Sequence, residues 1–149
     1  MTSSPVKIAL SIISRGKGEE KHLDQALSSI APYVDAIFLT FTEPTNYLEE
    51  AEKIAKKYNA TISYYPEKKI MDQATVDWLK DFLGCEPNMK VGDKLFLFDD
   101  ARNFNLAQIP QEYVWFVWID TDDVFIGGEN LHMLAEQADK QNIEAIYFN

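Results

Sequence analysis

The strongest constraint on the fold is a regular alternation of apolar runs with segments of helical period. Val6–Ile13 is a nearly continuous apolar run rich in β-branched residues, a pattern typical of a strand covered on both faces. A segment with apolar residues three and four positions apart follows and predicts a helix with one buried face, ended by Pro32. The apolar positions of this helix are Leu23, Ala26, Leu27 and Ile30.

The same pattern is then repeated. Asp35–Phe41 predicts a second strand, residues 48–58 a second amphipathic helix, and Ala60–Tyr65 a third strand. Strands that alternate with helices need crossover connections, and these place neighbouring strands parallel to one another. The sequence therefore predicts an α/β fold with an open, mostly parallel sheet flanked by helices, in which Val6–Ile13 is a central strand.

The second half of the chain first interrupts this rhythm and then resumes it. Residues 66–98 form a turn-rich stretch with one amphipathic helix, and we interpret residues 69–96 as an insertion. The apolar face of that helix carries Val76, Leu79, Phe82 and Leu83. We find no internal repeat, low-complexity tract or linker, so we expect one domain over residues 1–149.

After the insertion, Ala101–Gln108 predicts a short helix, and Tyr113–Ile119 is the most apolar run of the chain. We expect this run to be a central strand, with Trp115 and Trp118 packed in the core. A further helix through Leu131, Leu134 and Ala138 and a last strand over Glu144–Phe148 complete the predicted elements.

Charge and cysteine content exclude several classes of protein. With 14 basic and 24 acidic residues the formal net charge is −10, which disfavours nucleic acid and anionic membrane surfaces as partners. Cys85 is the single cysteine, so an intrachain disulfide is impossible and a reducing, cytoplasmic setting fits. No apolar run approaches the roughly 20 residues that a membrane-spanning helix needs, so we expect no membrane span.

The strongest chemical signal is the sequence WIDTDDVF, which places Asp120, Asp122 and Asp123 directly after the most apolar strand. Open α/β sheets bind their ligands at this carboxyl edge. Carboxylates one residue apart can hold a divalent cation that also bridges substrate phosphates, so we expect Asp120 and Asp122 as metal ligands. Asp120 could instead accept a hydrogen bond from a ribose hydroxyl or from a metal-bound water. The competing interpretation is an Asp-rich turn that leads into a helix.

These features together resemble the family 2 glycosyltransferases of the GT-A, Rossmann-like fold. The resemblance rests on the segment ARNFNLAQ before the strand that ends in WIDTDD, and it extends to ISRGKGEEKHLDQAL and VDAIFLTF near the start. It covers nearly the whole chain except Lys69–Phe96. The pairing of an ARN helix with a D-x-D motif is more specific than D-x-D alone.

The resemblance implies a role for each matching residue. Ser14 and Arg15 would lie near the nucleotide base, and Asp120 and Asp122 near the ribose and the metal-bound diphosphate, with Mn²⁺ or Mg²⁺ as the metal. Arg102 matches the ARN motif, and its guanidinium could reach a base or a diphosphate with a planar fork.

For Arg102 the alternative is an exposed helix arginine paired with Asp99 or Glu112. Asn103, its neighbour in the motif, favours the functional interpretation.

The chain departs from the family where the second strand ends. Many relatives carry an acidic residue there to contact the base, whereas this chain has Thr40-Phe41-Thr42-Glu43. Thr40 and Thr42 could bind the base through their hydroxyls, or Glu43 could substitute from the loop. A Thr-rich strand exit without contact to a ligand is the alternative.

The function that the resemblance implies is metal-dependent transfer of a sugar from a nucleoside diphosphate sugar to an acceptor hydroxyl, and we expect the donor to be a UDP-sugar. The general base of inverting members would lie beyond Asn149, so we expect the chain to be the donor-binding half, truncated after the D-x-D motif. It would be either a piece of a longer enzyme or a natural short form.

Two other functions are open. The first is a catalytically incomplete module that binds a nucleotide or a partner. The second is a nucleotidyltransferase, which ranks last because residues 14–18 match its Gly-rich basic loop poorly.

Overall fold

The computed structural model describes residues 6–43, 45–66 and 69–148 of the chain. It divides into two compact units, one of residues 1–65 with 101–149 and the other of residues 66–100. Residues 1–5, 44, 67–68 and 149 fall within the predicted domain or its insertion and lie outside the described residues. A division into two compact units does not by itself separate one domain with an insertion from two domains. The prediction of one domain over residues 1–149, with an insertion at residues 69–96, stays a prediction.

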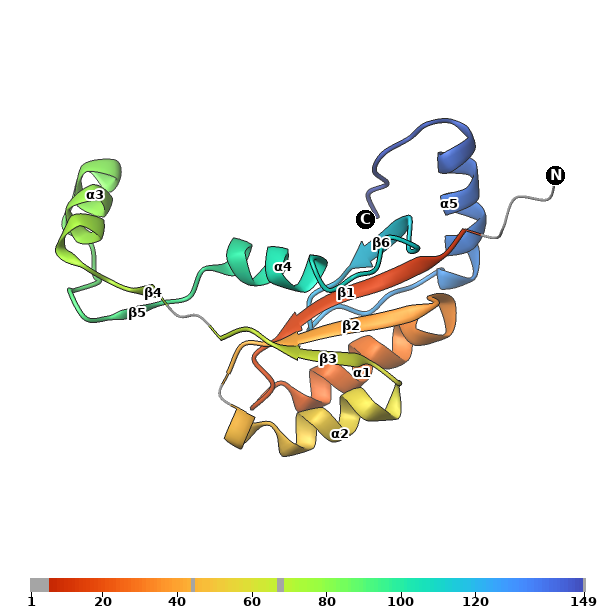
Figure 1. Ribbon diagram of the computed structural model, residues 1–149, viewed down its shortest axis with the longest axis horizontal. Coiled ribbons are helices and arrows are strands. Elements are labelled where there is room, and N and C mark those ends of the chain that lie inside the picture. Colours follow the sequence, from red (N-terminus) through yellow and green to blue (C-terminus); the bar gives the residue numbers. More distant parts are fainter. Residues whose placement is uncertain (1–5, 44, 67–68, 149) are drawn as a thin grey trace. The chain divides into compact units, whose positions relative to one another are not determined.

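The larger unit is built on a parallel sheet with the strand order β3-β2-β1-β6, and the predicted α/β class is confirmed (Figure 1). The strands are β1 (Ile8–Ser14), β2 (Ala36–Phe41), β3 (Thr61–Tyr64) and β6 (Trp115–Trp118). The helices of this unit are α1 (Glu20–Ile30), α2 (Glu49–Lys57) and α5 (Leu131–Lys140), together with the part of α4 (Phe98–Leu106) from Ala101 onward. Short 3₁₀ turns η1 (Ala31–Tyr33), η2 (Thr45–Tyr47) and η3 (Gly128–Asn130) lie between them. This arrangement is compatible with a Rossmann-like fold.

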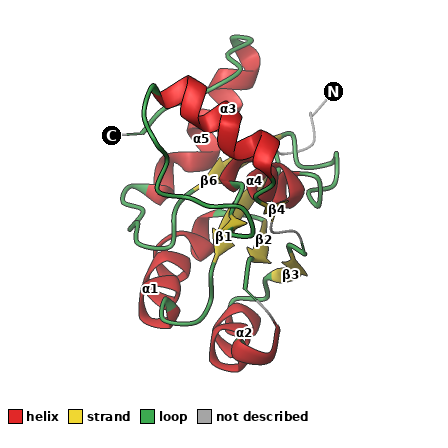
Figure 2. Ribbon diagram, turned by 90° about the vertical axis from the view of Figure 1, so that its left-hand side faces the viewer, coloured by secondary structure: helices red, strands yellow, loops and turns green. Residues whose placement is uncertain are grey.

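The apolar periodicity of the first half decides which face each helix covers. Leu10 and Ile12 of β1 pack with the apolar stripes of α1 and α2, which lie together on one side of the strands (Figure 2). Ile8, on the same face, packs against Leu131 and Ala135 of α5. Every residue of β1 is buried, so the prediction that this run is a central strand is confirmed.

The other face of the sheet is joined to α4 through one buried polar side chain. Asn105 is fully buried, and its amide donates to the carbonyl oxygens of Ile12 (3.3 Å) and Phe38 (3.0 Å) and to the Thr40 hydroxyl (2.8 Å). Its amide oxygen accepts from the hydroxyl of Ser11. Buried polar groups must be hydrogen-bonded, so this side chain fixes both the position and the rotation of α4 on the strands.

The position of β6 corrects two predictions. The run Tyr113–Ile119 was expected to be a central strand, but β6 pairs with β1 alone and lies at the edge of the described sheet. Its burial alternates, with Phe116 45% and Trp118 58% exposed, so the expectation of a buried Trp118 is wrong. Trp115, on the opposite face, packs beside the α5 contacts as predicted. An apolar run indicates that both faces of a strand can be buried, but other segments of the protein must pack against those faces to bury them.

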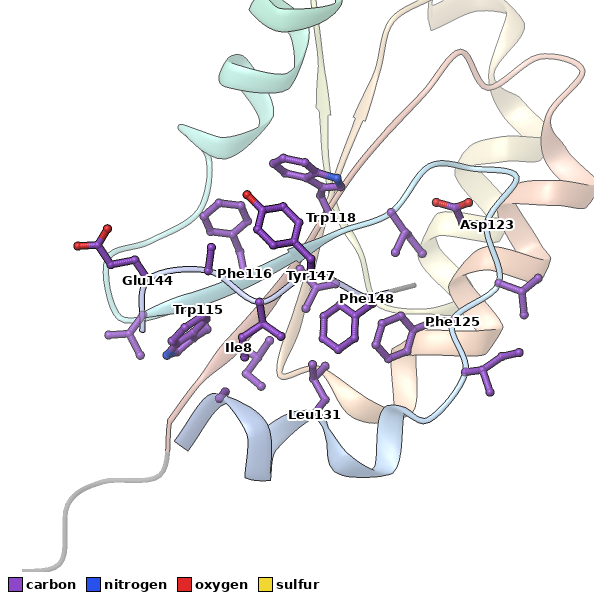
Figure 3. Close-up of a pocket in the computed structure, with 18 residues that line it drawn as sticks. Ile8, Trp115, Phe116, Trp118, Asp123, Phe125, Leu131, Glu144, Tyr147 and Phe148 are labelled. Atoms are coloured by element: carbon purple, nitrogen blue, oxygen red, sulfur yellow. The ribbon is translucent and has the colours of Figure 1, made fainter. Parts of the chain in front are cut away.

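The C-terminal stretch also differs from its prediction. Glu144–Phe148 forms no strand and is instead an irregular segment that lines a groove beside β6 (Figure 3). Phe148 packs edge-on against Phe125, with ring centroids 5.4 Å apart. These side-chain contacts hold the segment near β6 without a ladder of backbone hydrogen bonds.

The smaller unit contains the predicted amphipathic helix, α3 (Gln73–Leu83), and a short antiparallel pair, β4 (Lys69–Ile70) with β5 (Lys94–Leu95). Asp72 begins the helix by accepting from the Thr75 amide at 2.8 Å. The helix is confirmed, but none of its residues is buried, and on the predicted apolar face Phe82 is 73% and Leu83 53% exposed. None of the helices in the described part of the chain is long and apolar enough to cross a membrane.

Candidate functional site

The predicted site residues come from strand ends that meet at one edge of the sheet. Ser14 is the last residue of β1, and Asp120 lies two residues after the end of β6, which is the parallel neighbour of β1. The chain leaves β1 toward β2 on one side and returns as β6 on the other. In open parallel sheets such a switch in strand order leaves a crevice outside the carboxyl ends, where ligands bind.

Arg102 and Asp120 form the link between the ARN helix and the D-x-D turn. The Arg102 guanidinium donates to Asp120 Oδ1 at 2.8 Å, and it lies over the Trp118 ring at 5.3 Å from the ring centroid. Arg102 is only 8% exposed, whereas the Asp120 side chain is 57% exposed. The alternative of an exposed helix arginine is therefore wrong, and Glu112, one of its suggested partners, pairs with Lys7.

The three aspartates after β6 have different roles in the turn. The Asp120 amide donates to Asp123 Oδ2 at 2.9 Å, and the Asp123 amide donates to the Asp120 carbonyl at 3.1 Å. Asp123 thus stabilises a tight turn, as the competing interpretation of the motif expected. Asp122 is exposed at the turn. The turn and the site are compatible, because Asp122 stays exposed to solvent within the turn, two residues after Asp120.

The loop after β1 contains a site residue that the sequence analysis missed. Glu19 Oε2 accepts from the Ser14 hydroxyl (2.8 Å), the Arg15 amide (3.0 Å) and the Thr121 hydroxyl (3.3 Å). One carboxylate oxygen thus connects the loop after β1 with the turn between Asp120 and Asp122. The available signal was an acidic residue directly before a predicted helix, a common feature of helix starts that does not reveal a distant partner.

Gly16 gives this loop its shape. Its φ is +84°, and a Cβ at this position would lie 2.3 Å from Leu48 Cδ2 and 3.2 Å from the Phe41 ring. Both the backbone angle and the packing against Leu48 and Phe41, which are fully buried, exclude a side chain.

We expect Gly16→Ala to lower the free energy of unfolding by about 2–3 kcal/mol, because it adds backbone strain to overpacking. Gly127→Ala is the matched control, since Gly127 has nearly the same φ, +83°, but no atom within 4 Å of the added Cβ. Urea unfolding of both variants measures the difference. Equal losses would show that the loop adapts to the added methyl group.

The two threonines at the end of β2 occupy different environments. Thr40 is fully buried, and its hydroxyl is engaged by Ser63 at 2.7 Å and by the Asn105 amide. Thr42 lies at the edge, where its amide donates to the Ser14 carbonyl at 3.0 Å. The structure therefore brings Thr42 to Ser14 and places Thr40 inside the contact between sheet and helix.

The donor groups at the turn suit Mg²⁺ or Mn²⁺ bound together with a diphosphate. Among the described residues no group of three or more His, Cys, Asp and Glu side chains is arranged to hold a metal on its own. Mg²⁺ commonly binds through one or two carboxylates, waters and substrate phosphates. Asp122 and the second oxygen of Asp120 match this donor set, since Asp120 Oδ1 is engaged by Arg102.

An apolar groove of about 660 Å³ lies next to these residues, between β6, α5 and residues 144–148 (Figure 3). Asp123 lies at its rim, but Arg102, Asp120 and Asp122 are not among its lining residues. The groove therefore meets the charged turn at Asp123 and extends from there along β6.

No protein-family model and no curated protein matches the sequence. The membership in family 2 of the glycosyltransferases therefore stays a prediction that rests on the motifs.

Proposed function

We propose that this chain is the donor-binding half of a GT-A glycosyltransferase that transfers a sugar from a nucleoside diphosphate sugar to an acceptor hydroxyl. The observation that carries this proposal is the ion pair between Arg102 and Asp120. It joins the two sequence motifs, separated by 18 positions, at the carboxyl edge of a parallel sheet. Such an edge is where ligands of open α/β folds bind.

Each residue at this edge would have a different role in binding a nucleoside diphosphate. Asp122 is the exposed carboxylate and would hold the metal, while Asp120, fixed by Arg102, offers its second oxygen to a ribose hydroxyl or a metal-bound water. Arg102 offsets the negative charge of Asp120 near the incoming diphosphate. Bound Mn²⁺ or Mg²⁺ would stabilise the diphosphate leaving group as a Lewis acid.

The loop after β1 supplies the nucleoside side of this proposed site. Arg15 has a side chain that is 59% exposed, and Ser14 and Thr42 are joined through backbone. These residues would together bind the donor and stabilise the departing diphosphate.

Calorimetric titration of the full chain with UDP and Mn²⁺ tests the proposal. We expect binding that EDTA abolishes and that Asp122→Asn weakens about 30-fold or more, since one charged metal ligand is lost. Asp139→Asn is the matched control, because it removes the same charge from an exposed position on α5. Its affinity should stay within about twofold of wild type, because salt screens an exposed charge that is not a metal ligand.

If uridine, guanosine and thymidine diphosphates all fail to bind, the proposal is contradicted and the chain is better described as an interaction module. If Asp122→Asn and Asp139→Asn weaken binding equally, the effect reflects net charge and not a metal ligand.

A further inference from the structure

The carboxylate of Glu19 lies between the two segments that the proposed function assigns to the nucleoside and to the diphosphate. Its Oε2 accepts from Ser14 and the Arg15 amide in the loop after β1, and from Thr121 in the turn after β6. Its Oε1 lies 4.0 Å from Arg15 Nε. The Glu19 side chain is 27% exposed, so these contacts form in a partly desolvated setting, where hydrogen bonds to a charged acceptor are stronger than neutral ones.

The loop side of this connection is rigidly attached to the sheet. The Ser14 carbonyl accepts from the Thr42 amide at 3.0 Å, and the Ser14 hydroxyl, which donates to Glu19, also accepts from the Gly16 amide at 2.9 Å. Gly16 packs against buried side chains of β2 and of the residue before α2. Glu19 is therefore held by a fixed part of the fold.

The turn after β6 is more exposed to solvent than the loop after β1. Asp120 and Asp122 are both exposed, and Thr121, the residue between them, is partly buried with its hydroxyl directed to Glu19. This bond spans 102 positions in the sequence. It ties the middle of the turn to the fixed loop, while Arg102 holds its beginning.

We infer that Glu19 is a positioning residue, which couples the loop after β1 to the Asp120–Asp122 turn so that both sides of the donor site are ordered together. The inference rests on the proposed function for its ligand, but the coupling itself is a property of the free chain. Groups that orient metal ligands through a second set of hydrogen bonds commonly change affinity without touching the ligand.

The most selective test is Thr121→Val, which removes the hydroxyl at nearly constant shape. In the ligand-free chain we expect the Arg15 amide, which donates to the same Glu19 oxygen, to exchange with deuterium about fivefold faster, the equivalent of one hydrogen bond of typical net strength. With UDP and Mn²⁺ we expect about fivefold weaker binding, on the same basis. The thermal midpoint of unfolding should fall by no more than a few degrees, because a single partly buried hydrogen bond of about 1 kcal/mol is lost.

Thr121→Ser is the conservative variant that restores the hydroxyl, and it should return both the Arg15 exchange rate and the affinity to within about twofold of wild type. Glu19→Gln should also speed exchange of the Arg15 amide, since it keeps an oxygen acceptor but removes the charge that strengthens these hydrogen bonds. Glu20→Gln is its control, because Glu20 accepts from the Gly18 amide and has no hydrogen bond to the turn in the described structure.

The inference is overturned if Thr121→Val leaves Arg15 exchange unchanged, whatever happens to ligand binding. Its failure is distinguishable from failure of the proposed function. If wild type does not bind UDP with Mn²⁺ but Thr121→Val still speeds exchange of the Arg15 amide, the donor site is refuted and the coupling is retained. Binding that is lost in Thr121→Val and not restored by Thr121→Ser would also contradict a role for the hydroxyl.

Discussion

Asn105→Leu is expected to lower the free energy of unfolding by about 3–5 kcal/mol, because four hydrogen bonds of a fully buried side chain are lost together. Leucine has a similar volume, so the loss would come from polar groups and not from a cavity. The hydroxyl of Ser11 would remain buried without its acceptor, which adds a desolvation cost. Denaturant unfolding followed by circular dichroism measures the change.

Asn103→Leu is the matched control, since it makes the same substitution two positions earlier on the same helix at an exposed side chain. We expect a change within about 0.5 kcal/mol, as for most surface substitutions. Similar losses in the two variants would mean that Asn105 contributes no more than an exposed residue, and the proposed attachment of α4 to the sheet would be refuted.

Arg102→Met is expected to weaken binding of UDP with Mn²⁺ about 100-fold, which corresponds to about 2.7 kcal/mol. Methionine keeps much of the apolar stem of the side chain over Trp118 but removes the charge that offsets Asp120. An uncompensated Asp120 would repel the diphosphate and adopt other orientations. Calorimetry under the conditions used for wild type gives the affinity.

Arg102→Lys separates charge from geometry. Lysine preserves the positive charge but lacks the planar fork, so we expect it to recover only part of the affinity, about tenfold below wild type. Lys56→Met, on the exposed side of α2, controls for the change in net charge. If Arg102→Met binds the nucleotide as wild type does, Arg102 serves the fold alone and the observation that carries the proposed function is lost.

Much of the scaffold could be predicted because its signals are local. β1, β2, β3 and the helices α1, α2 and α5 form where apolar periodicity indicated them, since each buries a stripe that can be read within one segment. The Asp-rich turn at the carboxyl end of an apolar strand was also visible in the sequence. The last strand, Glu144–Phe148, was not formed, because a short apolar run becomes a strand only when a neighbouring strand pairs with it.

The sequence by itself determined the α/β class, the parallel direction of the first three strands and the place of the D-x-D motif at a strand end. Only the tertiary structure decided that Arg102 pairs with Asp120 and that Asn105, and not its neighbour Asn103, is the buried asparagine of the ARN helix. It also revealed Glu19 as the link between two loops. The physical reason is range: periodicity reports which face of a segment is buried, whereas the partner of a polar side chain, 18 or 102 positions away, depends on how the segments pack.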